Sequence, residues 1–212
     1  PGAWAGEVEA ALKHRPAAWA KLATAPGAPA HPVEVGRAVQ ALIDQSADAV
    51  LVCDGGEFGQ WAQACVSAPT RIINGPAGAI GAVLPFALGA RVAQQHAPVI
   101  AFMGDGTFGF HSAEFDTAVR YGLPFVLVVG NDARWNAEYQ IQLKSYGKER
   151  LIGCELLPTR YDTVAAAFGG HGELVTEAAQ LLPAVERALQ SGKPACVNVM
   201  MEGVPAPVVA RA

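Results

Sequence analysis

Short apolar runs that alternate with helical patterns place the strongest constraint on the fold of this chain. Six such runs lie between residues 49 and 200, and most are separated by stretches whose apolar residues recur at helical spacing. Strands that are apolar throughout are typical of a parallel sheet that helices cover on both faces. We therefore predict a three-layer α/β fold. Its predicted strands are residues 49–53, 71–73, 99–103, 125–129, 173–175 and 196–200.

Helical patterns fill most of the intervals between these runs. In Rossmann-like folds of this kind, ligands bind at the carboxyl ends of the strands, so the residues that follow each strand are the candidates for function. The predicted helices are residues 33–44, 60–66, 80–95, 113–121, 162–168 and 177–190.

The 212 residues suffice for one such domain with flanking segments. Residues 1–31 are rich in Ala and Pro, which favours a linker from a preceding domain with one short helix around residues 7–14. We expect the folded domain to span residues 32–203 and a tail to span 204–212. The first residue is Pro1 rather than Met, so we expect a fragment of a longer polypeptide.

Charge, hydropathy and cysteine spacing exclude several classes of protein. The net charge of -4 argues against a nucleic-acid-binding surface. The longest apolar run, residues 79–90, is shorter than the ~20 residues that span a bilayer, so we expect no membrane association. Cys53, Cys65, Cys154 and Cys196 form no CxxC pair and are predicted to be reduced thiols of a cytoplasmic protein.

Two acidic turns follow neighbouring predicted strands. The sequence Gly104-Asp105-Gly106-Thr107 comes directly after one strand, and Asn131-Asp132-Ala133-Arg134 follows the next. Glycines beside an aspartate let the backbone approach a phosphate closely. Mg²⁺ prefers oxygen ligands and commonly shares some of them with a phosphate group. The two turns therefore predict a site for Mg²⁺ and a diphosphate.

The same glycines allow a second interpretation. Gly104, Gly106 and Gly109 satisfy the G-x-G-x-x-G pattern of dinucleotide-binding proteins, which would make the chain an oxidoreductase domain that binds NAD or FAD. The carboxylate of Asp105 would then face a pyrophosphate without a metal, and that contact is repulsive. Asp105 and Asp132 are also ordinary turn formers, so a purely structural role is the simplest alternative.

The order of these motifs resembles the GDG…NN signature of thiamine diphosphate enzymes, in particular the group of acetolactate synthase, oxalyl-CoA decarboxylase and 2-hydroxyacyl-CoA lyase. The resemblance covers residues 32–203 and implies the C-terminal, diphosphate-binding domain of such an enzyme. It implies thiamine diphosphate and Mg²⁺ as cofactors, with the metal held by Asp105, Asp132 and the main-chain oxygen of Arg134. The usual Asn-Asn pair is Asn131-Asp132 here, so Asn131 is an alternative metal ligand.

The resemblance extends to two further loops. Residues 54–58 match the first strand-end loop, and residues 74–81 match the Gly-rich loop whose hydrophobic residue, here Ile80, supports the bent cofactor. Trp135 and Tyr139 are interpreted as pocket residues or as anchors of their loop. The residues implied to bind the cofactor are Glu57, Phe58, Gly78, Ile80, Gly104, Gly106, Thr107, Asn131, Trp135 and Asn136.

The implied activity is the making or breaking of C–C bonds in small-molecule substrates, 2-keto acids or 2-hydroxyacyl-CoA, by a lyase or transferase. The activating glutamate comes from a pyrimidine-binding domain of the same or a partner chain, so we expect no catalytic residue here and no turnover by this chain alone. A homo-oligomer, such as a dimer, is expected. A benzoylformate-type decarboxylase and a non-catalytic assembly domain remain as alternatives.

Overall fold

The computed structural model describes residues 2–74 and 78–208 and shows a layered α/β domain. The strands are β1 (Val50–Cys53), β2 (Thr70–Ile73), β3 (Val99–Gly104), β4 (Val126–Asn131), β5 (His171–Val175) and β6 (Ala195–Met200). The helices are α1 (Ala3–Lys13), α2 (Ala17–Lys21), α3 (Pro32–Ile43), α4 (Gly56–Cys65), α5 (Val83–Ala93), α6 (Asp105–Phe108), α7 (Glu114–Tyr121), α8 (Asn136–Tyr146), α9 (Tyr161–Ala167) and α10 (Leu181–Gln190), with 3₁₀ turns η1 (Lys148–Arg150) and η2 (Ala178–Gln180).

In the part of the chain that the structure describes, the strands form one six-stranded sheet in the order β2-β1-β3-β4-β6-β5. All of the strand pairs are parallel. The chain passes from β1 outward to β2 and then returns to β3 on the other side of β1. This change of direction opens a crevice between the carboxyl ends of β1 and β3, where ligands of such sheets bind.

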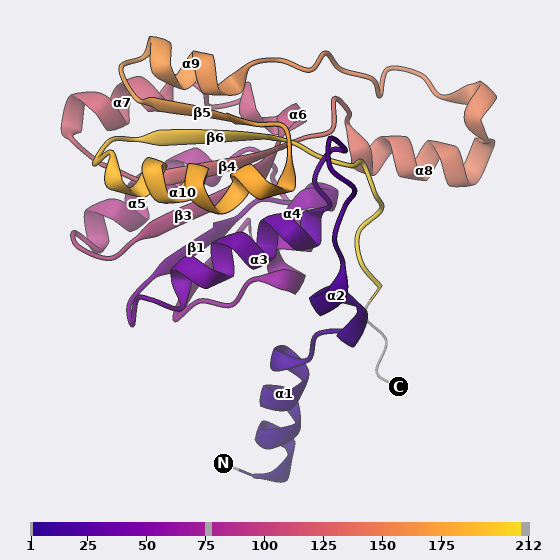
Figure 1. Cartoon of the computed structure of the whole chain (residues 1–212), viewed down its shortest axis with the longest axis horizontal. Helices are drawn as coiled ribbons and strands as arrows, with labels where there is room; N and C mark the ends of the chain where they lie inside the picture. The colour runs from indigo at the N-terminus through magenta and orange to yellow at the C-terminus, as the bar shows by residue number, and fades with distance from the viewer. Residues whose placement is uncertain (1, 75–77, 209–212) are drawn as a thin grey trace.

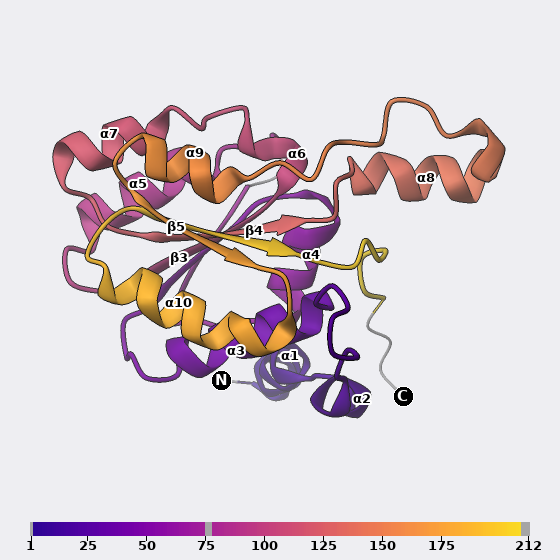
Figure 2. The same ribbon diagram turned by 45° about the horizontal axis from the view of Figure 1, so that its top comes forward.

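Helices cover both faces of the sheet, as Figure 2 shows. One hydrophobic core lies between the sheet and α3, α4 and α10, and it contains Phe58, Trp61 and Phe102. The other lies under α5, α6, α7 and α9 and includes Phe108 and Phe115. Successive residues of β3 and β4 belong alternately to the two cores, because successive side chains of a strand point to opposite faces. This explains why these strands are apolar throughout.

The structure confirms the predicted three-layer, Rossmann-like fold with parallel strands. Each predicted strand is present, with ends shifted by at most a few residues. The predicted helix over residues 80–95 is shorter and runs from Val83 to Ala93. The four cysteines are free, as predicted.

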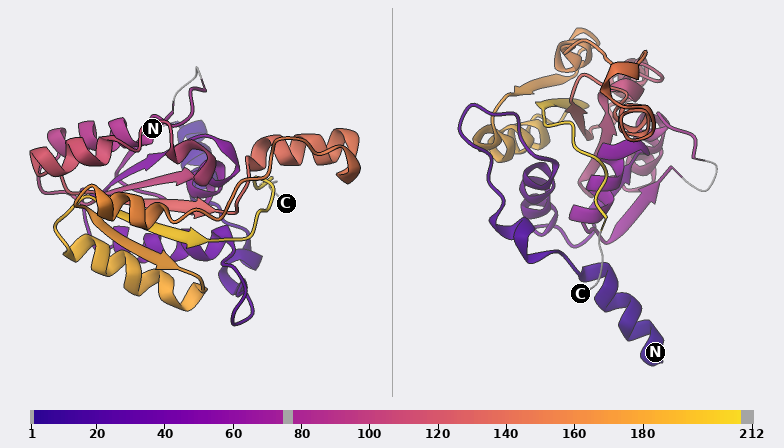
Figure 3. Two further views of the ribbon diagram at one scale, coloured as in Figure 1. Left: turned by 90° about the horizontal axis from the view of Figure 1, so that it is seen from above. Right: turned by 90° about the vertical axis from the view of Figure 1, so that its right-hand side faces the viewer.

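Helix α8 was not among the helices predicted from the sequence. The helix projects away from the body of the domain, as Figures 1 and 3 show. Ile141 and Tyr146 are largely exposed on it, and Asn136 is its one buried residue. A helix without a buried face has no apolar stripe, so helical periodicity could not reveal it.

The segment before residue 32 contacts the core more than its composition indicated. The predicted helix is present as α1, which projects from the domain and buries no residue. Farther along, Trp19 and Leu22 pack against the core, and Ala30 is fully buried in a parallel bridge with Met201. Among the described residues, the structure contains no helix with both the length and the hydropathy to cross a membrane.

The adjacent strand ends of β3 and β4 offer a matched test of packing. Gly104 and Gly130 are paired in register. A methyl group at Gly130 would lie 2.5 Å from the Phe58 ring, whereas one at Gly104 would meet nothing within 4 Å. We predict that Gly130→Ala lowers the free energy of unfolding by about 1–3 kcal/mol, because the methyl group overpacks the core. Gly104→Ala should cost less than about 1 kcal/mol. Urea denaturation of both variants tests this, and equal stability losses would contradict it.

Candidate functional site

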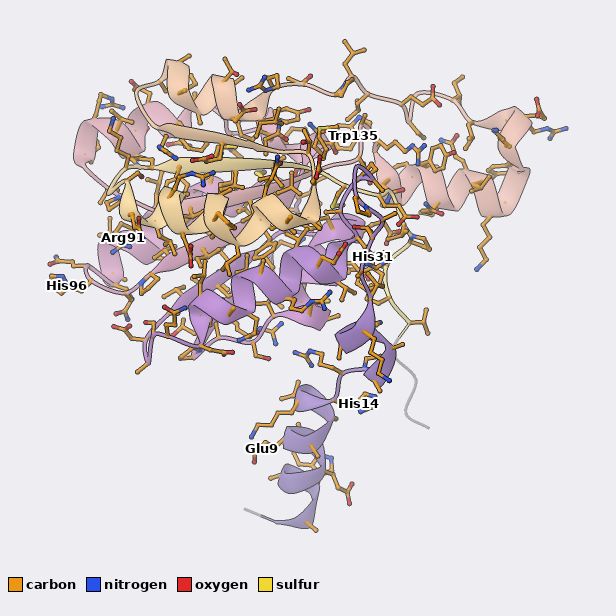
Figure 4. All side chains as sticks on the ribbon, viewed as in Figure 1. Glu9, His14, His31, Arg91, His96 and Trp135 are labelled. Carbon is orange, nitrogen blue, oxygen red and sulfur yellow. The ribbon has the colours of Figure 1, made fainter. Side chains whose placement is uncertain are left out.

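A cavity opens at the carboxyl end of the sheet, at the crevice between β1 and β3. Trp135 marks this end in Figure 4, whereas Arg91 and His96 lie at the opposite end. The cavity has a volume of about 140 Å³. Its lining residues come from the segments that follow β1, β3 and β4, together with Ile80: they are Gly55–Phe58, Ile80, Gly104–Thr107, Gly130, Asp132 and Arg134–Glu138.

Most of the residues predicted to form the site therefore lie together. The two exceptions are Gly78 and Asn131, which do not line this cavity. Gly78 has a left-handed backbone, with φ +65°, and follows residues 75–77 of the predicted Gly-rich loop, which lie outside the described residues.

Asp105 is the most unusual side chain of the cavity. It is 3% exposed, and its Oδ1 accepts a hydrogen bond from the Gly106 N–H at 2.9 Å. Within the described residues, its Oδ2 is buried without a hydrogen-bond partner. Burial, followed by the negative charge of Asp132, raises the pKa of Asp105 to about 7. A buried carboxylate oxygen without a partner is costly unless a cation or proton compensates it.

Asp132 supplies the second carboxylate. Burial raises its pKa to about 6, while the guanidinium of Arg134 acts in the opposite direction. That guanidinium lies 4.3 Å from the centre of the Tyr139 ring, so Tyr139 anchors Arg134 by a cation–π contact. Gly203 lies close to both Asp132 and Arg134, because a methyl group there would lie 2.9 Å from Arg134 Nη1 and 3.2 Å from Asp132 Oδ2.

The turn that carries Asp132 has a left-handed residue at its centre. Ala133 has φ +54°, the only positive φ among the described residues other than glycine. The following segment holds the turn: the Leu156 N–H donates to the Ala133 carbonyl at 2.7 Å, and the Trp135 N–H donates to the Cys154 carbonyl at 2.9 Å. The Trp135 ring in turn packs against Gly106, where a methyl group would approach it to 2.7 Å.

Asn131 has a different environment from its neighbour Asp132. It is fully buried, and its amide nitrogen donates to the Thr159 carbonyl at 2.9 Å and to Asn198 Oδ1 at 3.1 Å. Its amide oxygen accepts from the Ala133 N–H at 3.3 Å. Asn131 therefore uses its polar atoms inside the protein, and Asp132 is the residue of this pair that lines the cavity.

Asp54 connects two walls of the cavity. It is fully buried, and its carboxylate accepts hydrogen bonds from the N–H groups of Gly55, at 2.9 Å, and Gly81, at 3.0 Å. Thr107 Oγ1 donates to Asp54 Oδ2 at 2.8 Å. The Gly104 carbonyl is a second acceptor for this hydroxyl at 3.1 Å, so the side chain of Thr107, a predicted cofactor-binding residue, is hydrogen-bonded within the protein. Asp54 ties the loop beneath Ile80 to the turn that carries Asp105.

Two other predicted cofactor-binding residues contact the chain's own C-terminal segment. Glu57 accepts a hydrogen bond from the Ala206 N–H, and Asn136 Nδ2 donates to the Val204 carbonyl at 3.0 Å. Trp61 Nε1 donates to the Pro205 carbonyl at 2.9 Å. Residues 203–206 therefore join α4 to α8 along the edge of the cavity. Phe58, 4% exposed, packs on Phe102 and Gly130 and forms part of the cavity wall.

The arrangement fits a divalent cation that shares its ligands with a phosphate group. Two carboxylates and a nearby main-chain carbonyl offer the hard oxygen atoms that Mg²⁺ prefers. The described residues contain no group of three or more His, Cys, Asp or Glu side chains that could hold a metal. A cation at Asp105 would therefore need further ligands, and the open glycine-lined cavity leaves room for them.

Fold and site together are those of an α/β domain with a ligand-sized cavity at the carboxyl ends of its parallel strands. The chain matches the family described as "Thiamine pyrophosphate enzyme, C-terminal TPP binding domain" over residues 54–199 and belongs to this family. It is 40% identical to a probable acetolactate synthase of Mycobacterium bovis over 178 residues, which cover 82% of this chain and 32% of that protein. It is 32% identical to 2-hydroxyacyl-CoA lyase 2 of Bos taurus over 207 residues, which cover 93% of this chain and 32% of the lyase.

The chain thus spans about a third of the length of these curated relatives. The relatives are named as a synthase and a lyase, which supports an enzyme family and thiamine diphosphate as its cofactor. The comparisons do not favour the NAD or FAD interpretation of the glycine pattern, nor the benzoylformate-type and non-catalytic alternatives. The glycine pattern allowed the NAD or FAD alternative because G-x-G-x-x-G specifies a close backbone approach rather than a particular ligand.

Sequence reasoning missed two residues that shape the cavity. Asp54 was part of a predicted loop but was not assigned to the site, although an acidic residue directly after an apolar strand is a recognisable signal. Gly203 carries no such signal, since its closeness to Asp132 arises only when the C-terminal segment crosses the ends of the strands.

The raised pKa of the buried Asp105 carboxylate leads to a prediction of how the free energy of unfolding depends on pH. Because the folded-state pKa of Asp105, about 7, exceeds its ordinary value of 3.8, the folded chain binds more protons than the unfolded chain between these values. The free energy of unfolding of the metal-free chain should therefore fall as the pH rises from about 4 to about 7. Asp105→Asn mimics the protonated form and should stabilise the metal-free chain by about 1–3 kcal/mol at pH 8.

Urea denaturation in the presence of a chelator, at pH 5 and pH 8, measures this effect. The exposed Asp116, which pairs with Arg120, provides the control: Asp116→Asn should not stabilise the chain at either pH. If Asp105→Asn destabilises the metal-free chain at pH 8, the carboxylate is compensated by some other group.

Proposed function

We propose that this chain binds the diphosphate of thiamine diphosphate through Mg²⁺, with Asp105, Asp132 and the main-chain oxygen of Arg134 as protein ligands. The buried, unpartnered Oδ2 of Asp105 beside the half-buried carboxylate of Asp132 is the observation that carries the proposal. Mg²⁺ between these carboxylates and an anionic diphosphate would compensate the negative charges on both sides.

The glycines of the cavity support this proposal. A methyl group at Gly104 would meet no protein atom within 4 Å, so the space beside this backbone is free for a ligand. Gly106, in contrast, must be glycine because the Trp135 ring occupies the place of a side chain. Ile80, 36% exposed, lines the same cavity and is positioned to support the organic part of the cofactor.

We infer that the enzyme to which this chain belongs makes or breaks C–C bonds of 2-keto acids or 2-hydroxyacyl-CoA. The relatives named as an acetolactate synthase and a 2-hydroxyacyl-CoA lyase support this inference. The cofactor supplies the electron sink for this chemistry when it is bound. The residues of this chain bind and orient it and hold its charged end away from water. A pyrimidine-binding domain, in the same or a partner chain, would supply the activating glutamate. The dimeric state and the cytoplasmic location remain predictions.

Calorimetric titration of the chain tests the cofactor assignment. We predict that thiamine diphosphate binds weakly and only when Mg²⁺ is present, because neither the carboxylates nor the diphosphate is compensated without it. NAD, titrated under the same conditions, should not bind. NAD binding that is indifferent to Mg²⁺ would contradict the proposal.

A separate test asks whether this chain alone contains a complete active site. The chain alone should show no decarboxylation of a 2-keto acid with saturating cofactor and Mg²⁺, because the activating glutamate is expected on another domain. Turnover by the purified chain, if lost on Asp105→Ala, would show that it contains a complete site.

Two substitutions of Asp132 distinguish the effect of its negative charge from its proposed role as a metal ligand. Asp132→Asn keeps an oxygen ligand but removes one negative charge from the diphosphate side, so affinity for Mg²⁺-thiamine diphosphate should be equal or up to about tenfold higher. Asp132→Ala removes the ligand and should lower the affinity by at least about tenfold. The same calorimetric titration measures both, and equal effects of the two variants would remove Asp132 from the ligand set.

A further inference from the structure

A chain of buried hydrogen bonds runs from helix α9 through strand β6 to the turn that carries Asp132. Strand β6 is apolar except for Asn198, which is fully buried. Asn198 and Asn131 lie on the same face of the sheet as Cys196 and Val129, which belong to the core under α9. Asn198 Nδ2 donates to Asp162 Oδ1 at 3.2 Å, and Asn198 Oδ1 accepts from Asn131 at 3.1 Å.

Each hydrogen bond of this network has its donor on the side of Ala133 and its acceptor on the side of Asp162. The Ala133 N–H donates to Asn131, Asn131 donates to Asn198, and Asn198 donates to the carboxylate of Asp162. The two amide nitrogens also donate to the carbonyl of Thr159, at 2.9 and 3.1 Å, which uses their remaining protons. A buried network whose donors are all satisfied fixes the orientation of each amide and strengthens its bonds cooperatively.

Asp162, at the α9 end of this hydrogen-bond network, carries a stabilised negative charge. Arg160 donates to Asp162 at 2.6 Å. Burial opposes ionisation of Asp162, but the hydrogen bonds from Arg160 and Asn198 lower its pKa. An ionised carboxylate accepts only, so it fixes which side of the Asn198 amide faces it. The near end is the strained Ala133, whose left-handed backbone is costly for an L-residue and needs external support.

We propose that Asn198 is a positioning residue for the metal site: through Asn131 it holds the left-handed turn at Ala133 and so aims Asp132 and the carbonyl of Arg134 at the cavity. This inference rests on the proposed function for the identity of the ligand, but the hydrogen bonds from which it is argued lie entirely within the protein. It also gives Asn131 a definite role as a link in the hydrogen-bond chain rather than as a metal ligand.

The test compares two buried residues of β6. Asn198→Leu removes the hydrogen bonds and keeps the branched shape of the side chain, and Asn198→Ser is a smaller variant whose hydroxyl is too short to bridge the two partners. Val197→Ala is the control, because Val197 is equally buried on the opposite face of the sheet. Urea denaturation first establishes that each variant folds and how stable it is.

Two measurements then separate positioning from stability. Hydrogen exchange of the Ala133 and Arg134 amides should accelerate by at least about tenfold in the Asn198 variants, relative to a Val197→Ala control of similar stability. The affinity for Mn²⁺ alone, followed by electron paramagnetic resonance, should fall by about tenfold or more in the same variants. Adding Ala133→Gly, which removes the strain at this position, should restore part of the Mn²⁺ affinity.

The outcomes distinguish the two proposals. If neither exchange nor Mn²⁺ affinity differs between the Asn198 variants and the control, the positioning role is wrong, whatever the chain binds. If the wild-type chain binds Mn²⁺ neither alone nor together with thiamine diphosphate, the result counts against the proposed function of this chain, and the exchange data alone decide the role of Asn198.

Discussion

The buried carboxylate of Asp105 lies beside the half-buried carboxylate of Asp132 without enough compensating positive charge, and the rest of the structure depends on this pair. Asp105 and Asp132 follow adjacent parallel strands, so the fold itself brings their charges together at one edge of the sheet. Arg134 offsets the negative charge only in part, since burial still raises the pKa of Asp132. A domain built in this way is less stable without its ligand than it could be. That cost is typical of a binding site, and the cation that we propose for this site would recover it on binding.

The rest of the structure keeps these carboxylates in place. Asp54 fixes the turn of Asp105 from one side, and the Trp135 ring closes over Gly106 from the other. The turn of Asp132 is held by the segment around Cys154 and by the buried amides behind it. A ligand site whose turns are fixed before binding loses little conformational entropy when the ligand arrives.

The outer surface of the domain fits a role as one part of a larger enzyme. Large apolar side chains are exposed near the cavity, among them Ile80 and Phe110, and others lie along the projecting helix α8. Apolar side chains exposed beside a cavity are typical of a surface that another domain or ligand contacts. The chain spans about a third of the length of its relatives, so these surfaces agree with the proposal that a further domain completes the site.

The sequence by itself determined the fold and most of the cavity. Apolar strands require cover on both faces, and polar residues that follow such strands must gather at one edge, so the meeting of Asp105 with Asp132 followed from local patterns. Only the tertiary structure decided which residue of the Asn131-Asp132 pair faces the cavity. That choice depends on Asn198, which is distant in sequence and whose hydrogen bonds leave no local pattern. Helix α8 was also not predicted, because an exposed helix needs no apolar stripe and so leaves no helical pattern in the sequence.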